Sequence, residues 1–206
     1  MIRLHGMSRS NYHCLIKAAL IEKNLEFEEI KAIPSQEADY LEKSPMGKVP
    51  CLETEQGFIS ESLAIIEYLD ALQPDPALLP REAFARAKTI ELIRHLELDV
   101  ELVARRCLPA AFFGAEASEE TRSSTQRDLQ RGMKALSRLL VCDPYIAGSE
   151  FTAADLYAFY TFGLASAIVR TIFDEDLLEG HDALKTLLQR LAERDSIAQI
   201  EAAKTA

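Results

Sequence analysis

The sequence predicts a small mixed α/β domain followed by an all-α domain. Residues 1–73 alternate short extended segments with helical segments, whereas residues 83–206 show only helical periodicity. Three prolines lie between them, in residues 74–82, where a helix cannot continue because proline lacks the backbone N–H that helices require. The sequence therefore predicts two domains joined by this linker.

Seven elements are predicted in the first domain, and their order suits a small mixed sheet with helices on its faces. Strands are recognised by alternating apolar and polar residues, and helices by apolar residues three and four positions apart. Asn24 is expected to end the first helix, since asparagine tolerates the left-handed conformation. In chain order we expect a strand at 2–5, a helix at 12–19, a strand at 26–30, a short helix at 36–43, a hairpin formed by 49–53 and 58–59, and a helix that opens at 60–62.

The second domain is expected to be a helical bundle. Its apolar residues recur at helical spacing in four stretches, of which the third is unusually apolar and is therefore expected to be central. The stretches are one long helix at 93–107 and further helices at 129–140, 156–163 and 184–191.

Composition argues against several classes of function. The 206 residues carry a net charge of −10, which disfavours nucleic-acid partners. The chain begins without a secretory signal, and no stretch approaches the length of an apolar membrane span, so a cytoplasmic protein without a membrane segment is expected. Its four cysteines and four histidines lack paired metal-ligand spacing, so no metal is expected.

Four short segments carry the most specific features of the sequence: residues 7–12, 45–50, 61–69 and 147–155. In order and spacing they resemble the cytosolic glutathione transferase family over nearly the full length of the chain. The resemblance implies a thioredoxin-like, glutathione-binding domain at 1–73 and an all-α domain at 83–206. It also implies glutathione as co-substrate and a homodimer.

The first segment lies where this family places its catalytic side chain. The thiolate form of glutathione is the nucleophile, and a hydroxyl donor at the positive end of a helix can stabilise it. Ser10 falls where serine-type members carry that hydroxyl, so it is the candidate catalytic residue. Ser8, Asn11 and Tyr12 remain competitors, and Ser10 could instead serve only as a helix cap.

The second and third segments are the candidate glutathione-binding residues. The resemblance implies a cis bond before Pro50, leaving the backbone of Val49 to pair with the cysteinyl part of glutathione like an edge strand. It also implies that Lys48 reaches the glycine carboxylate, although this lysine could be an ordinary surface residue. Glu61 and Ser62 are expected to hold the γ-glutamyl end, or alternatively only to cap the next helix.

The fourth segment has a structural interpretation. Thr152 and Asp155 have the spacing of a capping box, with aspartate in place of the usual glutamate, and support the fold rather than a reaction. The leading functional hypothesis is a transferase that adds glutathione to an apolar electrophile. The alternatives are a noncatalytic binding or regulatory protein on the same scaffold, and a glutathione-dependent peroxidase or isomerase. Residues 10–12 lack the serine-serine-cysteine signature of the maleylacetoacetate isomerases, which weakens that assignment.

Overall fold

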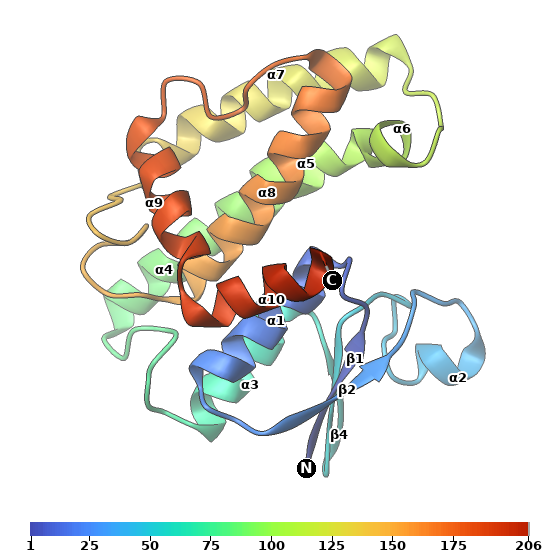
Figure 1. Cartoon of the computed structure of the whole chain (residues 1–206), viewed down its shortest axis with the longest axis vertical. Coiled ribbons are helices and arrows are strands. Elements are labelled where there is room, and N and C mark those ends of the chain that lie inside the picture. The colour runs from blue at the N-terminus through green and yellow to red at the C-terminus, as the bar shows by residue number, and fades with distance from the viewer. Residues whose placement is uncertain (206) are drawn as a thin grey trace. The chain divides into compact units, whose positions relative to one another are not determined.

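The computed structural model describes residues 1–205, which form two compact units (Figure 1). The first unit contains Met1–Leu79 together with the chain from Glu193 onward, and the second contains Pro80–Ala192. The first is the mixed α/β unit and the second is entirely helical, which confirms the predicted fold class.

The first unit is built on a four-stranded sheet in the order β2-β1-β3-β4. Strand β1 pairs parallel with β2 and antiparallel with β3, and β3 forms a hairpin with β4. Helices α1 and α3 pack together on one side of the sheet, and α2 lies on the other (Figure 1). The elements are β1 (Ile2–Gly6), α1 (Asn11–Glu22), β2 (Phe27–Lys31), α2 (Ala38–Leu41), β3 (Cys51–Thr54), β4 (Gly57–Ser60) and α3 (Ser62–Leu72).

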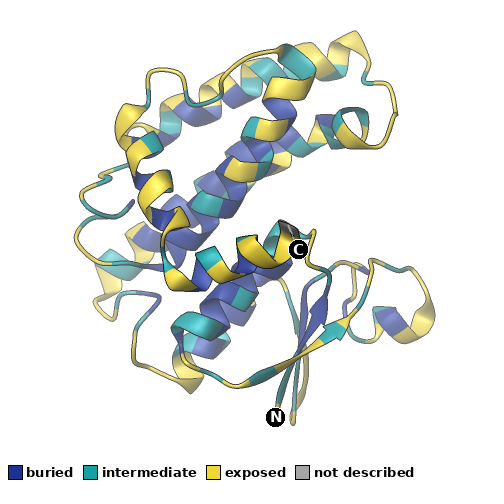
Figure 2. Cartoon of the chain, viewed as in Figure 1, coloured by how far each residue is buried: buried dark blue, intermediate teal, exposed yellow. Residues whose placement is uncertain are grey.

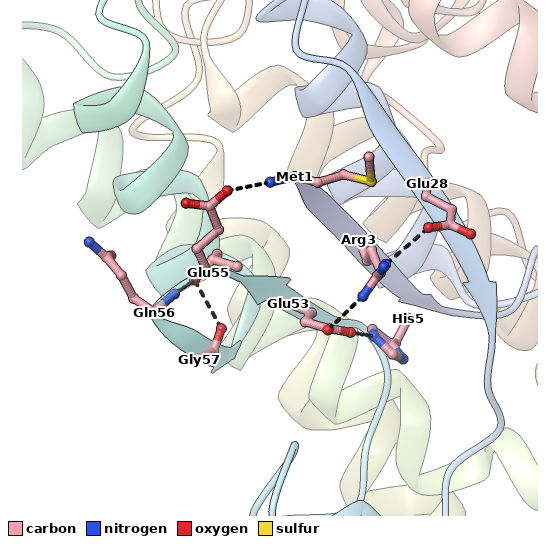
Figure 3. A network of polar contacts seen from close by, with 9 residues as sticks. Met1, Arg3, His5, Glu28, Glu53, Glu55, Gln56 and Gly57 are labelled. Carbon is pink, nitrogen blue, oxygen red and sulfur yellow. Dashed lines mark hydrogen bonds and ion pairs between the residues drawn. The ribbon is translucent and has the colours of Figure 1, made fainter.

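A polar network on the sheet ties β1 to both of its neighbours (Figure 3). Arg3 donates from Nε to Glu28 of β2 and from Nη1 to Glu53 of β3, each at 3.0 Å. The ring of His5 lies 2.7 Å from the second oxygen of Glu53. Exposed pairs of this kind contribute little individually, but here two side chains of β1, Arg3 and His5, share the carboxylate of Glu53 on β3, which favours a single register.

A buried ion pair joins the end of α1 to α3 and to the start of the linker. Lys23 is fully buried, and its Nζ donates to Oδ1 of Asp70 at 2.8 Å and to the carbonyl of Pro76 at 2.6 Å. The same carboxylate accepts the backbone N–H groups of Leu78 and Leu79 at 2.7 and 3.3 Å. Every polar atom brought together here is therefore compensated, as burial requires.

The last helix, α10 (Asp195–Thr205), belongs to the first unit rather than to the helical one. It packs on α1, where Arg194 donates two hydrogen bonds to Glu22 at 2.6 and 2.7 Å, and Ser196 donates a third. The predicted division assigned all of residues 83–206 to the helical domain. In the structure the last helix instead belongs to the first unit. The periodicity of residues 195–205 is weak, so the pairing with Glu22 could not be read from the sequence.

The helical unit contains α4 (Ala83–His95), α7 (Glu119–Leu136), α8 (Ala153–Phe173) and α9 (Asp182–Ala192). The single long helix expected at 93–107 is wrong in detail. The chain continues from α4 through a π-helical segment η1 (Leu96–Glu101), a turn of α-helix α5 (Leu102–Ala104) and a 3₁₀ turn η2 (Arg105–Cys107) before α6 (Leu108–Phe112).

Two interactions explain why η1 departs from regular helix. A Cβ atom on Gly132 of α7 would come within 2.2 Å of the Asp99 carbonyl, so glycine permits the wide turn to approach α7. The carboxylate of Glu101 is buried and accepts from Thr161 Oγ1 and Arg105 Nε, both at 2.9 Å. The turn thus places the Glu101 carboxylate where Thr161 of α8 and Arg105 of η2 donate hydrogen bonds to it.

Helix α8 is central to this unit, as its apolarity predicted. Figure 2 shows buried residues concentrated along it. It is the one helix in residues 1–205 that is long and apolar enough to cross a membrane, with a mean hydropathy of 1.4. Half of that window is buried among the other helices of the unit, and such burial accounts for an apolar composition in a core helix.

The capping box predicted before α8 is present. The carboxylate of Asp155 accepts the backbone N–H of Thr152 at 2.8 Å, while the Thr152 hydroxyl accepts from the first turn of the helix. Asp155 also accepts the N–H of Ile146 at 2.8 Å, which ties the preceding loop to the helix start. The structural interpretation of this segment is confirmed.

Replacement of Lys23 by methionine tests the buried ion pair. We expect Lys23→Met to lower the free energy of unfolding by about 3–5 kcal/mol, because Asp70 keeps its charge in a site that has lost its cation. Urea denaturation followed by circular dichroism measures the change. The matched control, Lys31→Met on the exposed face of β2, should change it by less than about 0.5 kcal/mol. Equal effects of the two substitutions would contradict the assignment of Lys23 and Asp70 as a stabilising buried ion pair.

Candidate functional site

The register of the sheet brings the three candidate segments to one edge. His5 of β1 pairs with Cys51 of β3, and Cys51 pairs with Ser60 of β4. The chain leaves β1 toward Ser10 just beyond this row, enters β3 from Val49 and Pro50, and leaves β4 at Glu61 and Ser62. Segments that are separate in sequence therefore emerge from the same end of neighbouring strands, as a single binding site requires.

Ser10 is the N-cap of α1, so its capping role is confirmed. Its backbone is extended, and its Oγ accepts the N–H of His13 at 3.3 Å. The hydroxyl hydrogen is not used in this bond, because a hydroxyl can accept and donate at once. Ser10 is partly exposed at the positive end of a twelve-residue helix. Capping and donation to an anion are thus compatible in this geometry.

The competitors of Ser10 are placed differently. Ser8 is exposed, and its carbonyl accepts from the thiol of Cys14 at 3.1 Å. Burial raises the pKa of Cys14, so this thiol anchors the loop and is a poor nucleophile. Asn11 and Tyr12 are half-buried within the first turn of α1 and engaged in other interactions.

The bond between Val49 and Pro50 is cis, as expected from the resemblance. Among residues 1–205, no hydrogen bond uses the backbone N–H or C=O of Val49, so both groups are available to an extended ligand. The side chain of Lys48 is exposed. Lys48 stands at the same edge of the sheet, directly before Val49.

Three side chains that sequence reasoning missed hold this turn in place. Tyr40 donates to the Lys48 carbonyl at 3.3 Å, and the hydroxyl of Ser44 accepts the Lys48 N–H at 3.2 Å. Cys51 donates from its thiol to the Lys43 carbonyl at 3.0 Å, and burial raises its pKa to about 11. All three are buried. Tyrosine, serine and cysteine are ordinary residues in a protein core, so only the hydrogen bonds of these three side chains reveal that they hold the turn.

Glu61 has the most unusual backbone near the site, with φ 70° and ψ 119°. A non-glycine residue rarely adopts positive φ, and such strain often marks a functional position. Glu61 occupies the N-cap position of α3, but its side chain makes no capping hydrogen bond there. Ser62 is the first residue of α3 and is only 7% exposed. The α3 start thus has backbone donors suited to a carboxylate.

Comparison with known proteins decides the family. A model of the glutathione S-transferase N-terminal domain matches residues 4–77, and a model of the C-terminal domain matches residues 93–190. A glutathione S-transferase of Pseudomonas putida is 41% identical over 206 residues, covering 100% of this chain and 94% of the relative. The chain belongs to the glutathione S-transferase family. The expectations of family, fold and enzyme class are confirmed.

Solved structures of this family share the same architecture. A glutathione S-transferase of Methylobacterium radiotolerans, in complex with glutathione sulfonate, superimposes with a TM-score of 0.78 at 25% identity. That match covers 96% of this chain and 93% of the other. Glutathione transferase F2 of Populus trichocarpa gives a TM-score of 0.83 at 19% identity, with both chains covered completely. At this identity the likeness concerns the fold alone.

His13 of the transferase lies on the first turn of α1, beside the end of β1, and was not recognised from the sequence. Its ring is 2% exposed, packs so closely on Gly6 that a Cβ there would lie 2.2 Å away, and approaches Glu29 at 3.2 Å. Burial lowers the pKa of His13, while Glu29 raises it to a smaller extent. Residues 1–205 contain no cluster of three or more potential metal-ligating side chains.

The lowered pKa of His13 predicts a pH dependence of stability. As pH falls below about 6.5, the unfolded chain takes up a proton at this residue before the folded chain does, so stability decreases until the native pKa is reached. We expect His13→Gln to reduce the loss of unfolding free energy between about pH 7.5 and 5.5, measured by urea denaturation. His181→Gln is the control. If His13→Gln left the pH dependence unchanged, protonation of His13 would be excluded as its cause.

Proposed function

We propose that this transferase binds glutathione along the edge formed by Ser10, residues 48–50 and residues 61–62 and attaches it, through its sulfur, to an apolar electrophile. The observation that supports the proposal is the shared row of His5, Cys51 and Ser60, from which all three segments emerge. The family as a whole binds glutathione, and solved relatives contain it or its sulfonate.

In this proposal glutathione lies across the row formed by His5, Cys51 and Ser60. The Val49 N–H and C=O pair with the cysteinyl backbone, and the N–H groups at the start of α3 receive the γ-glutamyl carboxylate with the Ser62 hydroxyl. The carboxylate of Glu61, which makes no capping hydrogen bond to α3, attracts the γ-glutamyl ammonium. Lys48 pairs with the glycine carboxylate. The sulfur is then directed toward the loop after β1.

Ser10 acts on the sulfur by donating its hydroxyl hydrogen to the thiolate. The bond that Ser10 accepts from His13 fixes the hydroxyl oxygen, and the positive end of α1 favours the negative charge. A shift of one pKa unit in the glutathione thiol corresponds to about 1.4 kcal/mol. Holding both reactants together lowers the barrier further. The thiolate forms the new carbon–sulfur bond by addition or by displacement of a leaving group.

Three further elements remain proposals for this chain. The apolar electrophile is a small molecule, the protein acts in the cytoplasm, and the chain forms a homodimer. Sedimentation would test the dimer, since a monomer at micromolar concentration would exclude it. The linker at residues 74–82 remains the proposed boundary between the two functional domains.

Glutathione binding can be measured without any assumption about the reaction. A ligand that binds only the folded state stabilises it, by about 2.7 kcal/mol at one hundred times its Kd. We therefore expect millimolar glutathione to raise the melting temperature, and Glu61→Ala to reduce that increase. Glu67→Ala, an exposed change on the same helix, is the control. No increase with glutathione would favour the noncatalytic, regulatory alternative.

The role of Ser10 is tested by its replacement with alanine. Ser10→Ala should raise the pKa of bound glutathione by about one unit and slow conjugation of a reactive aryl halide about tenfold near neutral pH. The pKa is read from the ultraviolet absorbance of the thiolate as pH is varied. Ser8→Ala should change neither quantity. An unaltered thiol pKa in Ser10→Ala would assign the sulfur contact to Ser8, Asn11 or Tyr12 instead.

Peroxidase and isomerase reactions would use the same thiolate and differ in the second substrate. Assays with an organic hydroperoxide and with a cis-unsaturated diketo acid, compared with the aryl halide, distinguish the three reactions. Ser10→Ala should slow whichever of them the protein catalyses.

A further inference from the structure

The helical unit contains a hollow of about 410 Å³ between α7, the C-terminal half of α8 and the connection that leads to α9. Volumes of this size are typical of small-molecule sites. All residues that line the hollow belong to the helical unit, whereas the proposed glutathione-binding residues belong to the first unit. The hollow is therefore built from a different set of residues.

Apolar side chains form its floor and part of its wall. Leu129 and Met133 of α7 and Val169 of α8 are nearly fully buried, and Phe173 and Leu177 are partly exposed. An aromatic ligand could cover the exposed parts of Phe173 and Leu177 and remove apolar surface from water.

The connection between α8 and α9 is fixed by its own hydrogen bonds. Asp176 accepts the backbone N–H of Leu178 and the Nζ of Lys185, both at 2.9 Å. These bonds also lower the pKa of Asp176, so it stays ionised and its charge is balanced by Lys185. The backbone N–H groups of Glu179 and His181 donate to carbonyls within the same turn. The wall is therefore defined before any ligand arrives.

Glu175 supplies the charged group that orients a ligand. One oxygen of its carboxylate accepts from the neutral amide of Gln126 at 2.6 Å, and no cation pairs with this carboxylate among residues 1–205. The negative end of the α8 dipole lies directly before it in the chain. Lys134 of α7 also lines the hollow, from an exposed position where its long side chain can remain in water. The guanidinium of Arg122 lies 5.9 Å from the centre of the Phe173 ring and donates to the Ile172 carbonyl, but Arg122 does not line the hollow. Within the lining, the carboxylate beside Phe173 that has no cation partner among residues 1–205 is that of Glu175.

We propose that this hollow is a second ligand site, which binds a small planar aromatic molecule carrying a cationic nitrogen. The aromatic body covers Phe173 and Leu177 above the apolar floor, and the cation pairs with the Glu175 carboxylate. The net charge of −10 on the chain favours a cation at long range as well. Binding at this site does not require glutathione.

The test uses 9-aminoacridine, a planar fluorescent cation, with the full-length protein. We expect one dye per chain, bound with a Kd of about 10–100 μM. Gln130→Trp places a large side chain into the hollow from an exposed position and should weaken binding at least about tenfold, which corresponds to about 1.4 kcal/mol. Gln189→Trp, an exposed change on α9 outside the hollow, should have no effect.

The charge is tested separately. Glu175→Gln should weaken binding of 9-aminoacridine about three- to tenfold, whereas Glu179→Gln, an exposed change in the same connection, should not. Acridine, which is uncharged at neutral pH, should bind more weakly than the cation and should respond little to Glu175→Gln.

Three results would overturn the proposal. They are absence of dye binding up to about 1 mM, equal effects of Gln130→Trp and Gln189→Trp, and displacement of the dye by S-hexylglutathione. The last result would place the dye in the glutathione-dependent site. Conjugation of the aryl halide is measured in parallel, and all four variants should retain it whether or not the second site exists.

Discussion

The candidate site depends on one constraint, the register that aligns His5, Cys51 and Ser60 across three strands. Side chains of a strand alternate between faces, so a slip of one residue would turn every one of them over and move the adjoining loops along the sheet. The carboxylate shared between Arg3 and His5 and the buried Lys23–Asp70 pair both favour this single arrangement. The loops at the edge are therefore positioned by groups that never contact a ligand.

Hydrogen bonds of nearby side chains then fix the loops at that edge. Ser10 caps α1 and keeps a donor available, while Tyr40, Ser44 and Cys51 hold the turn that exposes the Val49 backbone. Glu61 is the site residue with a strained backbone, and the regular structure on either side of it, β4 and α3, can hold that conformation in place. A preorganised edge of this kind lowers the ordering cost of binding a flexible tripeptide.

The helical unit follows a different principle. Its central helix α8 is apolar because it is surrounded, and two buried carboxylates beside it are paired, Asp155 with Thr152 and Glu101 with Thr161. The hollow beside α7 departs from this pattern, since apolar side chains and an uncompensated carboxylate share a wall that is not filled. A departure from close packing is the kind of feature on which a ligand site can be built.

Periodicity and motifs determined much of this protein. Alternation and helical spacing predicted the strands, most helices and the capping box, because each depends on neighbours close in sequence, and the resemblance carried the family and the candidate residues. Only the tertiary structure decided that α10 packs on α1, that η1 widens against Gly132, and that Ser10, Val49 and Glu61 share one edge. Those features arise from contacts between residues far apart in the chain, such as Glu22 with Arg194, which no local pattern encodes.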